Sequence, residues 1–130
     1  MSVNLNKVML IDDNVIDLKI HSKLITIAKF FDEIISCQSG DDALDYIKAN
    51  INEPQKLPRF ILLDIQMPEM DGFEFLELYK KLPQSFTDNC QIAMLSSTLD
   101  FGDIKKAEAN PYVLKLLRKP LAIADLKKLI

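Results

Sequence analysis

Glycine is scarce in this chain: its 130 residues include only Gly40, Gly72 and Gly102. Nucleotide enzymes with a P-loop, and proteins with the dinucleotide-binding fingerprint, need several glycines within a few residues of one another. These three glycines are too far apart to form either loop. The sequence therefore excludes both classes of nucleotide-binding enzyme.

Other residue types and patterns are also rare or missing. The only cysteines, Cys37 and Cys90, fall in predicted strands, which favours buried free thiols over a disulfide or a metal site. The net charge of -3 provides no basic surface for nucleic acid. There is no apolar run that could cross a membrane, and the first residues do not resemble a signal peptide. We expect a cytoplasmic protein that contacts neither membrane nor nucleic acid directly.

The remaining sequence alternates between strand and helix patterns five times, in a length typical of one domain. Short apolar runs predict the strands, and apolar spacing with capping residues predicts the helices. The first helix has Ile16, Ile20, Leu24 and Ile27 at helical spacing. The predicted strands are 7–11, 33–37, 60–63, 90–95 and 112–117. The second predicted helix begins near residue 40, and the other three are 72–82, 100–109 and 122–130.

This alternation predicts βαβ units, a parallel sheet and helices on both of its faces. Ligands of such sheets bind outside the carboxyl ends of the strands. Polar residues follow four of the five predicted strands at that end. They are Asp12-Asp13, Asp64, Ser96-Ser97-Thr98 and Arg118-Lys119-Pro120.

Chemically, these residues fit a phosphoryl-transfer site. Three close carboxylates repel one another unless a cation joins them, and oxygen ligands suit Mg²⁺. An aspartate beside such a metal can act as a nucleophile toward phosphorus, while a lysine and a hydroxyl stabilise the phosphoryl charge. Each residue also has a simpler interpretation: a helix cap for Asp12-Asp13-Asn14 or Asp64, solvent contact for Lys119, a turn for Ser96. Their joint placement at matching strand ends favours the site.

Four motifs together resemble the receiver domain of bacterial two-component response regulators. They are Asp12-Asp13, Asp64-Ile-Gln-Met-Pro-Glu-Met-Asp-Gly72, Leu95-Ser96-Ser97 and Lys119-Pro120, and they cover nearly the whole chain. The resemblance implies an α/β, flavodoxin-like, doubly wound sheet of five parallel strands in the order 2-1-3-4-5, with five helices. It implies a single receiver domain over residues 1–130.

The same resemblance implies a regulatory phosphoacceptor that assists its own phosphorylation and dephosphorylation and is not otherwise an enzyme. Asp64 accepts the phosphoryl group from a phosphohistidine of a sensor histidine kinase or a phosphotransfer protein. Mg²⁺, with Mn²⁺ as a substitute, binds directly to Asp13, Asp64 and the backbone carbonyl of Gln66. Asp12 acts mainly through a metal-bound water. The downstream target is not predicted.

Further roles follow for the neighbouring residues. By resemblance, Ser96 and Lys119 hold the phosphoryl group, and the peptide bond between Lys119 and Pro120 is cis. Gln66 and Thr98 flank the path of the attacking water. Neither is an acid or a base, whose help is worth roughly 10²–10⁴-fold, so slow self-dephosphorylation is predicted.

The sequence departs from the family at one position of the usual switch. Receivers usually carry an aromatic three residues before the lysine, and here that residue is Leu116. Tyr112 is too early in the predicted strand to replace it, so we predict a bypassed aromatic switch. The only histidine, His21, is predicted to be a surface or helix-flank residue.

Three rival functions remain to be weighed. A flavin-binding flavodoxin needs phosphate donors after the first strand, where Asp12-Asp13 would repel a phosphate. A phosphatase of the haloacid dehalogenase type needs a second aspartate two residues after the nucleophile, and Gln66 cannot supply a proton there. A receiver-like interaction module that never takes phosphate is the remaining alternative.

Overall fold

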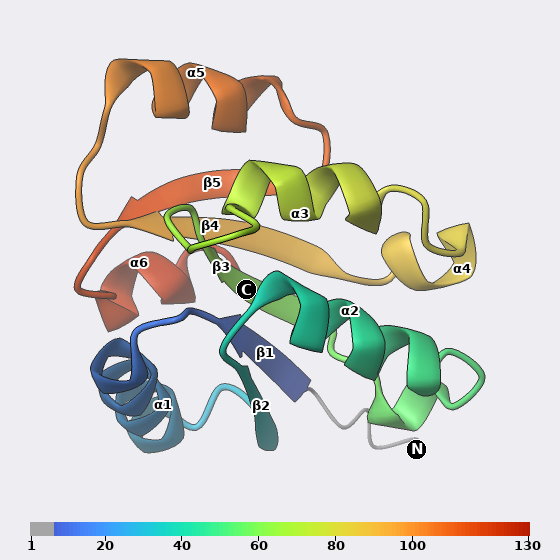
Figure 1. Cartoon of the computed structure of the whole chain (residues 1–130). Coiled ribbons are helices and arrows are strands. Elements are labelled where there is room, and N and C mark those ends of the chain that lie inside the picture. Colours follow the sequence, from blue (N-terminus) through green and yellow to red (C-terminus); the bar gives the residue numbers. More distant parts are fainter. Residues whose placement is uncertain (1–6) are drawn as a thin grey trace.

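The computed structural model describes residues 7–130, in which five parallel strands form one sheet of order β2-β1-β3-β4-β5 (Figure 1). The strands are β1 Lys7–Ile11, β2 Glu33–Cys37, β3 Phe60–Asp64, β4 Gln91–Ser96 and β5 Val113–Arg118. The helices are α1 Val15–Ala28, α2 Gly40–Ala49, α3 Gly72–Tyr79, α4 Gln84–Thr87, α5 Phe101–Ala109 and α6 Ile123–Lys127, with a 3-10 turn at Pro54–Lys56. The predicted fold class and strand order are confirmed.

The predicted number of helices is too low by one. The described residues contain six α-helices, because the predicted loop 83–89 includes the single turn α4. Pro83 precedes this turn, and the backbone N–H of Phe86 donates to its carbonyl at 3.0 Å. The Phe86 ring is buried against Tyr79, with 5.9 Å between ring centroids. Burial of this aromatic side chain draws the polar segment onto the core.

Helices cover both faces of the sheet, and each face has its own hydrophobic core. Side chains of α1 and α6 pack on one face, while α2, α3, α4 and α5 pack on the other. The central strands β1 and β3 are buried throughout, which explains their uninterrupted apolar sequences. The edge strands β2 and β5 are only partly buried and include exposed positions.

Strand register brings the carboxyl ends of the strands to one edge of the sheet. Ile11 is paired with Leu63, one residue before Asp64. Asp64 is paired with Leu95, one residue before Ser96. The residues that follow these strand ends therefore lie close together, as the alternating pattern predicts.

The first helix presents a different face to the core than its sequence suggests. Ile16, Ile20 and Ile27 are 69%, 46% and 68% exposed, whereas Leu18 and Ile25 are buried. Both sets have helical spacing, so periodicity alone does not select the buried one. The apolar series from Ile16 to Ile27 lies mainly on the outer surface.

Cys37 and Cys90 are buried free thiols, as predicted, and burial raises the pKa of Cys37 to about 11. Cys90 lies one residue before β4 rather than inside it. Among the helices of residues 7–130, none has the length and apolar character needed to cross a membrane.

Candidate functional site: an acidic pocket at the carboxyl edge of the sheet

The loop after β1 does not use its two aspartates to cap the next helix. Asn14, and neither aspartate, caps α1: its side chain accepts hydrogen bonds from the backbone N–H groups of Ile16 and Asp17 at 3.0 and 3.1 Å. Asp12 Oδ1 accepts the N–H of Asn14 at 3.0 Å, which fixes the carboxylate at the strand end. Asp12 is 3% exposed, and Asp13 is exposed.

A tight turn positions Asp64 at the end of β3. The next helix is capped by Asp71, whose side chain forms a capping box with Glu74, so Asp64 has no capping role. Gly72 lies so close to the strand end that a Cβ atom would be 2.7 Å from the Asp64 carbonyl oxygen. Glycine is thus required for the close approach of α3 to β3.

The three predicted carboxylates do converge. Asp12, Asp13 and Asp64 offer ligand oxygens that all lie within 4.8 Å of one another. Asp64 is 4% exposed, and its burial, followed by repulsion from Asp12, raises its pKa to about 7. A cation of hard character would relieve this repulsion. The oxygen donor set and its spacing fit Mg²⁺.

Lys119 is the cation that the chain itself brings to the pocket. Its Nζ lies 2.8 Å from Asp12 Oδ2, 2.9 Å from Asp17 Oδ2 and 3.3 Å from Asp64 Oδ1. Burial opposes the charged form, but the hydrogen bonds and negative charges of these aspartates raise the pKa of Lys119 above its ordinary value. Its backbone N–H donates to the carbonyl of Ser96 at 2.8 Å, and the bond to Pro120 is cis.

The hydroxyl after β4 is buried but is engaged elsewhere. Ser96 is fully buried, and its Oγ donates to the Thr98 carbonyl while it accepts the Thr98 N–H at 3.2 Å. It must rotate before it can donate to a group on Asp64. The side chains of Thr98 and Gln66 are exposed, so neither is held by the core.

Sequence reasoning missed two residues of α1 at this site. Asp17 binds Lys119, and His21, predicted to lie on the surface or helix flank, is only 3% exposed. His21 Nε2 accepts the N–H of Leu121 at 3.3 Å, and burial lowers the pKa of its imidazole. The spacing of both residues after Asp13, four and eight, places them on one face of the predicted helix and could have indicated their role.

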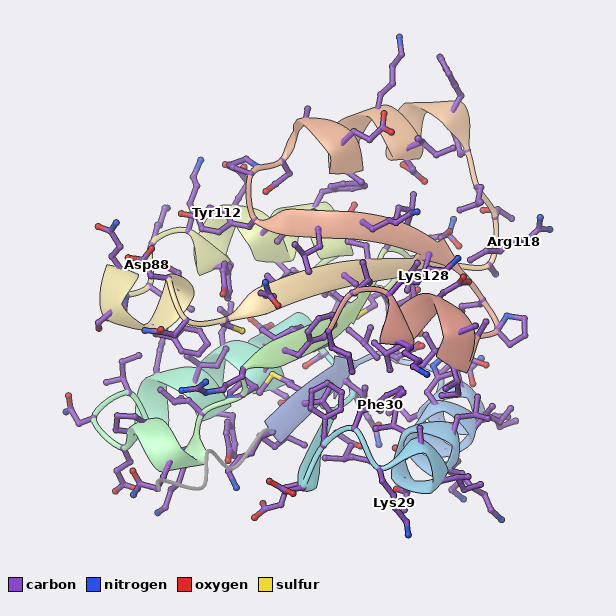
Figure 2. The ribbon with its side chains drawn as sticks, turned by 180° about the vertical axis from the view of Figure 1, so that it is seen from behind. Lys29, Phe30, Asp88, Tyr112, Arg118 and Lys128 are labelled. Carbon is purple, nitrogen blue, oxygen red and sulfur yellow. The ribbon has the colours of Figure 1, made fainter. Side chains whose placement is uncertain are left out.

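Strand β5, which carries the expected switch position, contains no aromatic residue. Leu116 is half-buried and pairs with Met94 of β4. Tyr112 packs edge-on against Tyr79, with 5.4 Å between ring centroids, at the end of β5 opposite to Arg118 (Figure 2). Tyr112 therefore lies away from the acidic pocket.

Comparison with known proteins identifies the family to which this chain is similar. Residues 8–130 match the response regulator receiver domain family. A solved response regulator receiver protein from Dyadobacter fermentans is 36% identical, with a TM-score of 0.85, and the match covers 95% of this chain and 93% of that one. A solved two component response regulator from Cytophaga hutchinsonii is 31% identical, with a TM-score of 0.90 and coverage of 98% and 95%.

Curated relatives differ in length. The probable methanogenesis regulatory protein FilR2 of Methanothrix harundinacea is 30% identical over 127 residues, which are 95% of this chain and 77% of that protein. Hybrid signal transduction histidine kinase L of Dictyostelium discoideum is also 30% identical over 127 residues, but the chain spans only 7% of that protein. On its fold, its acidic pocket and these matches, the chain belongs to the response regulator receiver domain family of two-component signalling.

Proposed function

We propose that Asp64 is the phosphoacceptor of this receiver. The observation that carries the proposal is a buried carboxylate that lies beside Asp12 and Asp13 and 3.3 Å from the ammonium of Lys119. Such an arrangement presents a nucleophilic oxygen next to a cation that can balance incoming negative charge. No comparable cluster of three acidic, cysteine or histidine side chains occurs elsewhere in residues 7–130.

In the proposed reaction, a carboxylate oxygen of Asp64 attacks the phosphorus of a phosphohistidine on a sensor histidine kinase or a phosphotransfer protein. The new P–O bond forms as the P–N bond breaks, and the electron pair leaves with the imidazole nitrogen. The protein contributes position and charge to this step, as is usual for phosphoryl transfer. It therefore assists its own phosphorylation while serving as a regulator.

We assign Mg²⁺, or Mn²⁺ in its place, to the acidic pocket. Asp13 and Asp64 would bind it directly together with the backbone carbonyl of Gln66. Both oxygens of Asp12 already accept hydrogen bonds, from Asn14 and from Lys119, which supports a role through a metal-bound water. When bound, the metal supplies positive charge beside the phosphoryl oxygens.

Two side chains would hold the phosphoryl group after transfer. Lys119 is already in the pocket, and its ammonium can donate to a phosphoryl oxygen. Ser96 would exchange its hydrogen bond to Thr98 for one to the phosphoryl group, which pulls the loop between β4 and α5 inward. This movement is the proposed signal to partners.

We also propose that Gln66 and Thr98 set the lifetime of the aspartyl-phosphate. Both side chains are exposed beside the strand ends that carry Asp64 and Ser96. Neither can remove a proton from water efficiently, so hydrolysis proceeds without general-base help. Slow self-dephosphorylation is expected.

For the chain as a whole, we propose one receiver domain over residues 1–130. The family, and the match of this chain to part of a hybrid histidine kinase, support a kinase or phosphotransfer protein as the phosphodonor. Buried free thiols and a net charge of -3 support a cytoplasmic location and recognition of proteins rather than nucleic acid.

The proposal is tested by intact-mass spectrometry after incubation with acetyl phosphate and Mg²⁺. The wild-type chain should gain one phosphoryl group, and Asp64→Asn should gain none. Asp45→Asn, which removes the same charge from the exposed side of α2, is the matched control and should be labelled like the wild type. Equal labelling of Asp64→Asn would refute the acceptor assignment, and no labelling of the wild type would favour the phosphate-independent interaction module.

The metal assignment is tested separately by calorimetric titration with Mg²⁺. Asp13→Ala should lose most of the affinity, because it removes a direct ligand. The same variant should melt at a higher temperature without metal, since one of three repelling carboxylates is gone. Unchanged Mg²⁺ affinity would contradict the site.

A further inference from the structure

Lys119 is held from the α1 side of the pocket by an aspartate outside the predicted site. Its hydrogen bonds are to Asp12 Oδ2 at 2.8 Å and Asp17 Oδ2 at 2.9 Å. The acceptor Asp64 is farther away, at 3.3 Å. The side chain of Lys119 is 11% exposed and that of Asp17 30%, so the pair is partly shielded from water.

A second contact fixes the same loop to the same helix. The imidazole of His21 accepts the backbone N–H of Leu121, two residues after Lys119. Asp17 and His21 are four residues apart in α1 and therefore lie on one face of the helix. Because the backbone is anchored beside α1, the approach of Lys119 to Asp17 is part of the packing rather than a chance contact of a long side chain.

The number of donors on the ammonium limits what Lys119 can bind. An ammonium has three N–H groups. Two of them serve Asp12 and Asp17, which leaves one for Asp64, whose Oδ1 lies 3.3 Å from the ammonium nitrogen. A phosphoryl group on Asp64 adds strong acceptor oxygens on that side of the ammonium.

We propose that Asp17 is a positioning residue that holds Lys119 toward α1 in the unphosphorylated protein and competes with the phosphoryl group for its ammonium. The inference rests on the proposed function of Asp64. As the bond between Asp64 and phosphorus forms and the donor's bond to phosphorus breaks, Lys119 gives up Asp17 and donates to a phosphoryl oxygen. Its ammonium remains protonated and its hydrogen bond to Asp12 is kept.

The test compares phosphorylation kinetics of the full chain with acetyl phosphate and Mg²⁺ as probes. Asp17→Asn keeps the size of the side chain but removes the charge that retains Lys119. The limiting rate at saturating acetyl phosphate should rise about tenfold, which corresponds to about 1.4 kcal/mol. The donor concentration at half-maximal rate should change little, since the effect is on transfer and not on donor capture.

Two further variants separate this role from a general effect of charge or folding. Asp17→Glu restores the carboxylate and should return the limiting rate toward the wild-type value. Asp45→Asn removes an equal charge from α2, where its side chain is exposed, and should leave the rate unchanged. A limiting rate in Asp17→Asn that is unchanged or lower than that of the wild type would overturn the inference.

A measurement without phosphodonor keeps the inference separate from the proposed function. Exchange of the Lys119 ammonium protons with water, followed by ¹H–¹⁵N NMR, should become several-fold faster in Asp17→Asn and stay unchanged in Asp45→Asn. Unchanged exchange would show that Asp17 does not retain Lys119. If the wild type is labelled and Asp17→Asn is labelled at the same rate, only the inference fails; if the wild type takes no phosphoryl group, the proposed function itself fails.

Discussion

The two ends of the sheet are built on opposite physical principles. At the carboxyl end, Asp12 and Asp64 are buried close to one another, and repulsion from Asp12 helps raise the pKa of Asp64. At the amino end, Tyr79 contacts Phe86 and Tyr112 through edge-on ring packing, with centroids 5.9 and 5.4 Å apart. The carboxyl end crowds carboxylates whose repulsion a cation can relieve, whereas the amino end packs aromatic rings against one another.

This contrast indicates a division of labour within one small core. Crowding carboxylates at a strand end is costly to folding, even with Lys119 beside them, but prepares the site for a cation and a phosphoryl group. Aromatic packing at the far end contributes stability without contacting the pocket. Mutations at the two ends should therefore have opposite effects on the unfolding free energy and on chemistry.

The largest effect on stability is expected at the aromatic end. Phe86→Ala leaves a cavity against Tyr79 and should lower the free energy of unfolding by about 3–5 kcal/mol. Phe101→Ala, at a ring that is 71% exposed, is the control and should change it by no more than about 0.5 kcal/mol. Denaturant titration gives both values. A small loss in Phe86→Ala would show that the aromatic cluster is not a main source of stability.

The next largest effect on the free energy of unfolding depends on pH and arises from Asp64 at the carboxyl end of the sheet in metal-free protein. The pKa of Asp64 is raised from its ordinary value of 3.8 to about 7, so folded protein retains a proton that unfolded chain releases between these values. The free energy of unfolding should therefore fall as pH rises through this window.

Asp64→Asn carries no such proton and provides the comparison. It should be more stable than the wild type at pH 8, and the difference should shrink toward pH 4. Melting curves of both proteins without metal over this pH range measure the effect. Parallel pH profiles would show that Asp64 ionises normally in the folded protein.

The switch prediction compares Ser96 with Leu116 on neighbouring strands. Ser96→Ala removes the hydroxyl that is proposed to move toward the phosphoryl group, so phosphorylation should no longer shift the amide signals of α5. Leu116→Ala should preserve these shifts, because no ring at this position has to turn inward. ¹H–¹⁵N spectra with and without acetyl phosphate decide between them. Loss of the shifts in Leu116→Ala alone would contradict the bypassed aromatic switch.

The smallest effect is expected at the exposed rim of the pocket. Thr98→Ala and Gln66→Asn should change the aspartyl-phosphate lifetime by about tenfold or less, since neither residue provides the proton transfer that is worth 10²–10⁴-fold. Thr26→Ala, at an exposed position of α1, should leave the lifetime unchanged. Decay of the phosphorylated mass after removal of acetyl phosphate measures all three. A change of about 10³-fold in the aspartyl-phosphate lifetime of either rim variant would show that its side chain has a direct chemical role.

The sequence by itself determined the alternation of elements and the residues at the strand ends. A parallel sheet requires crossovers, and its strand ends must share an edge, so Asp12, Asp64 and Lys119 could be placed together without coordinates. The buried central strands could also be predicted from the sequence, because strands covered on both faces are apolar throughout. These conclusions depend on local pattern and topology alone.

Only the tertiary structure decided which face of α1 is buried. The helix is apolar on two faces, and the cap at Asn14 and packing on the sheet select Leu18 and Ile25 rather than Ile16 and Ile27. The same orientation of α1 on the sheet also buries His21 and places Asp17 beside Lys119, more than 100 residues away in sequence. Helical periodicity is a property of one segment, whereas orientation and long-range ion pairs arise from the energy of packing that segment against the rest of the chain.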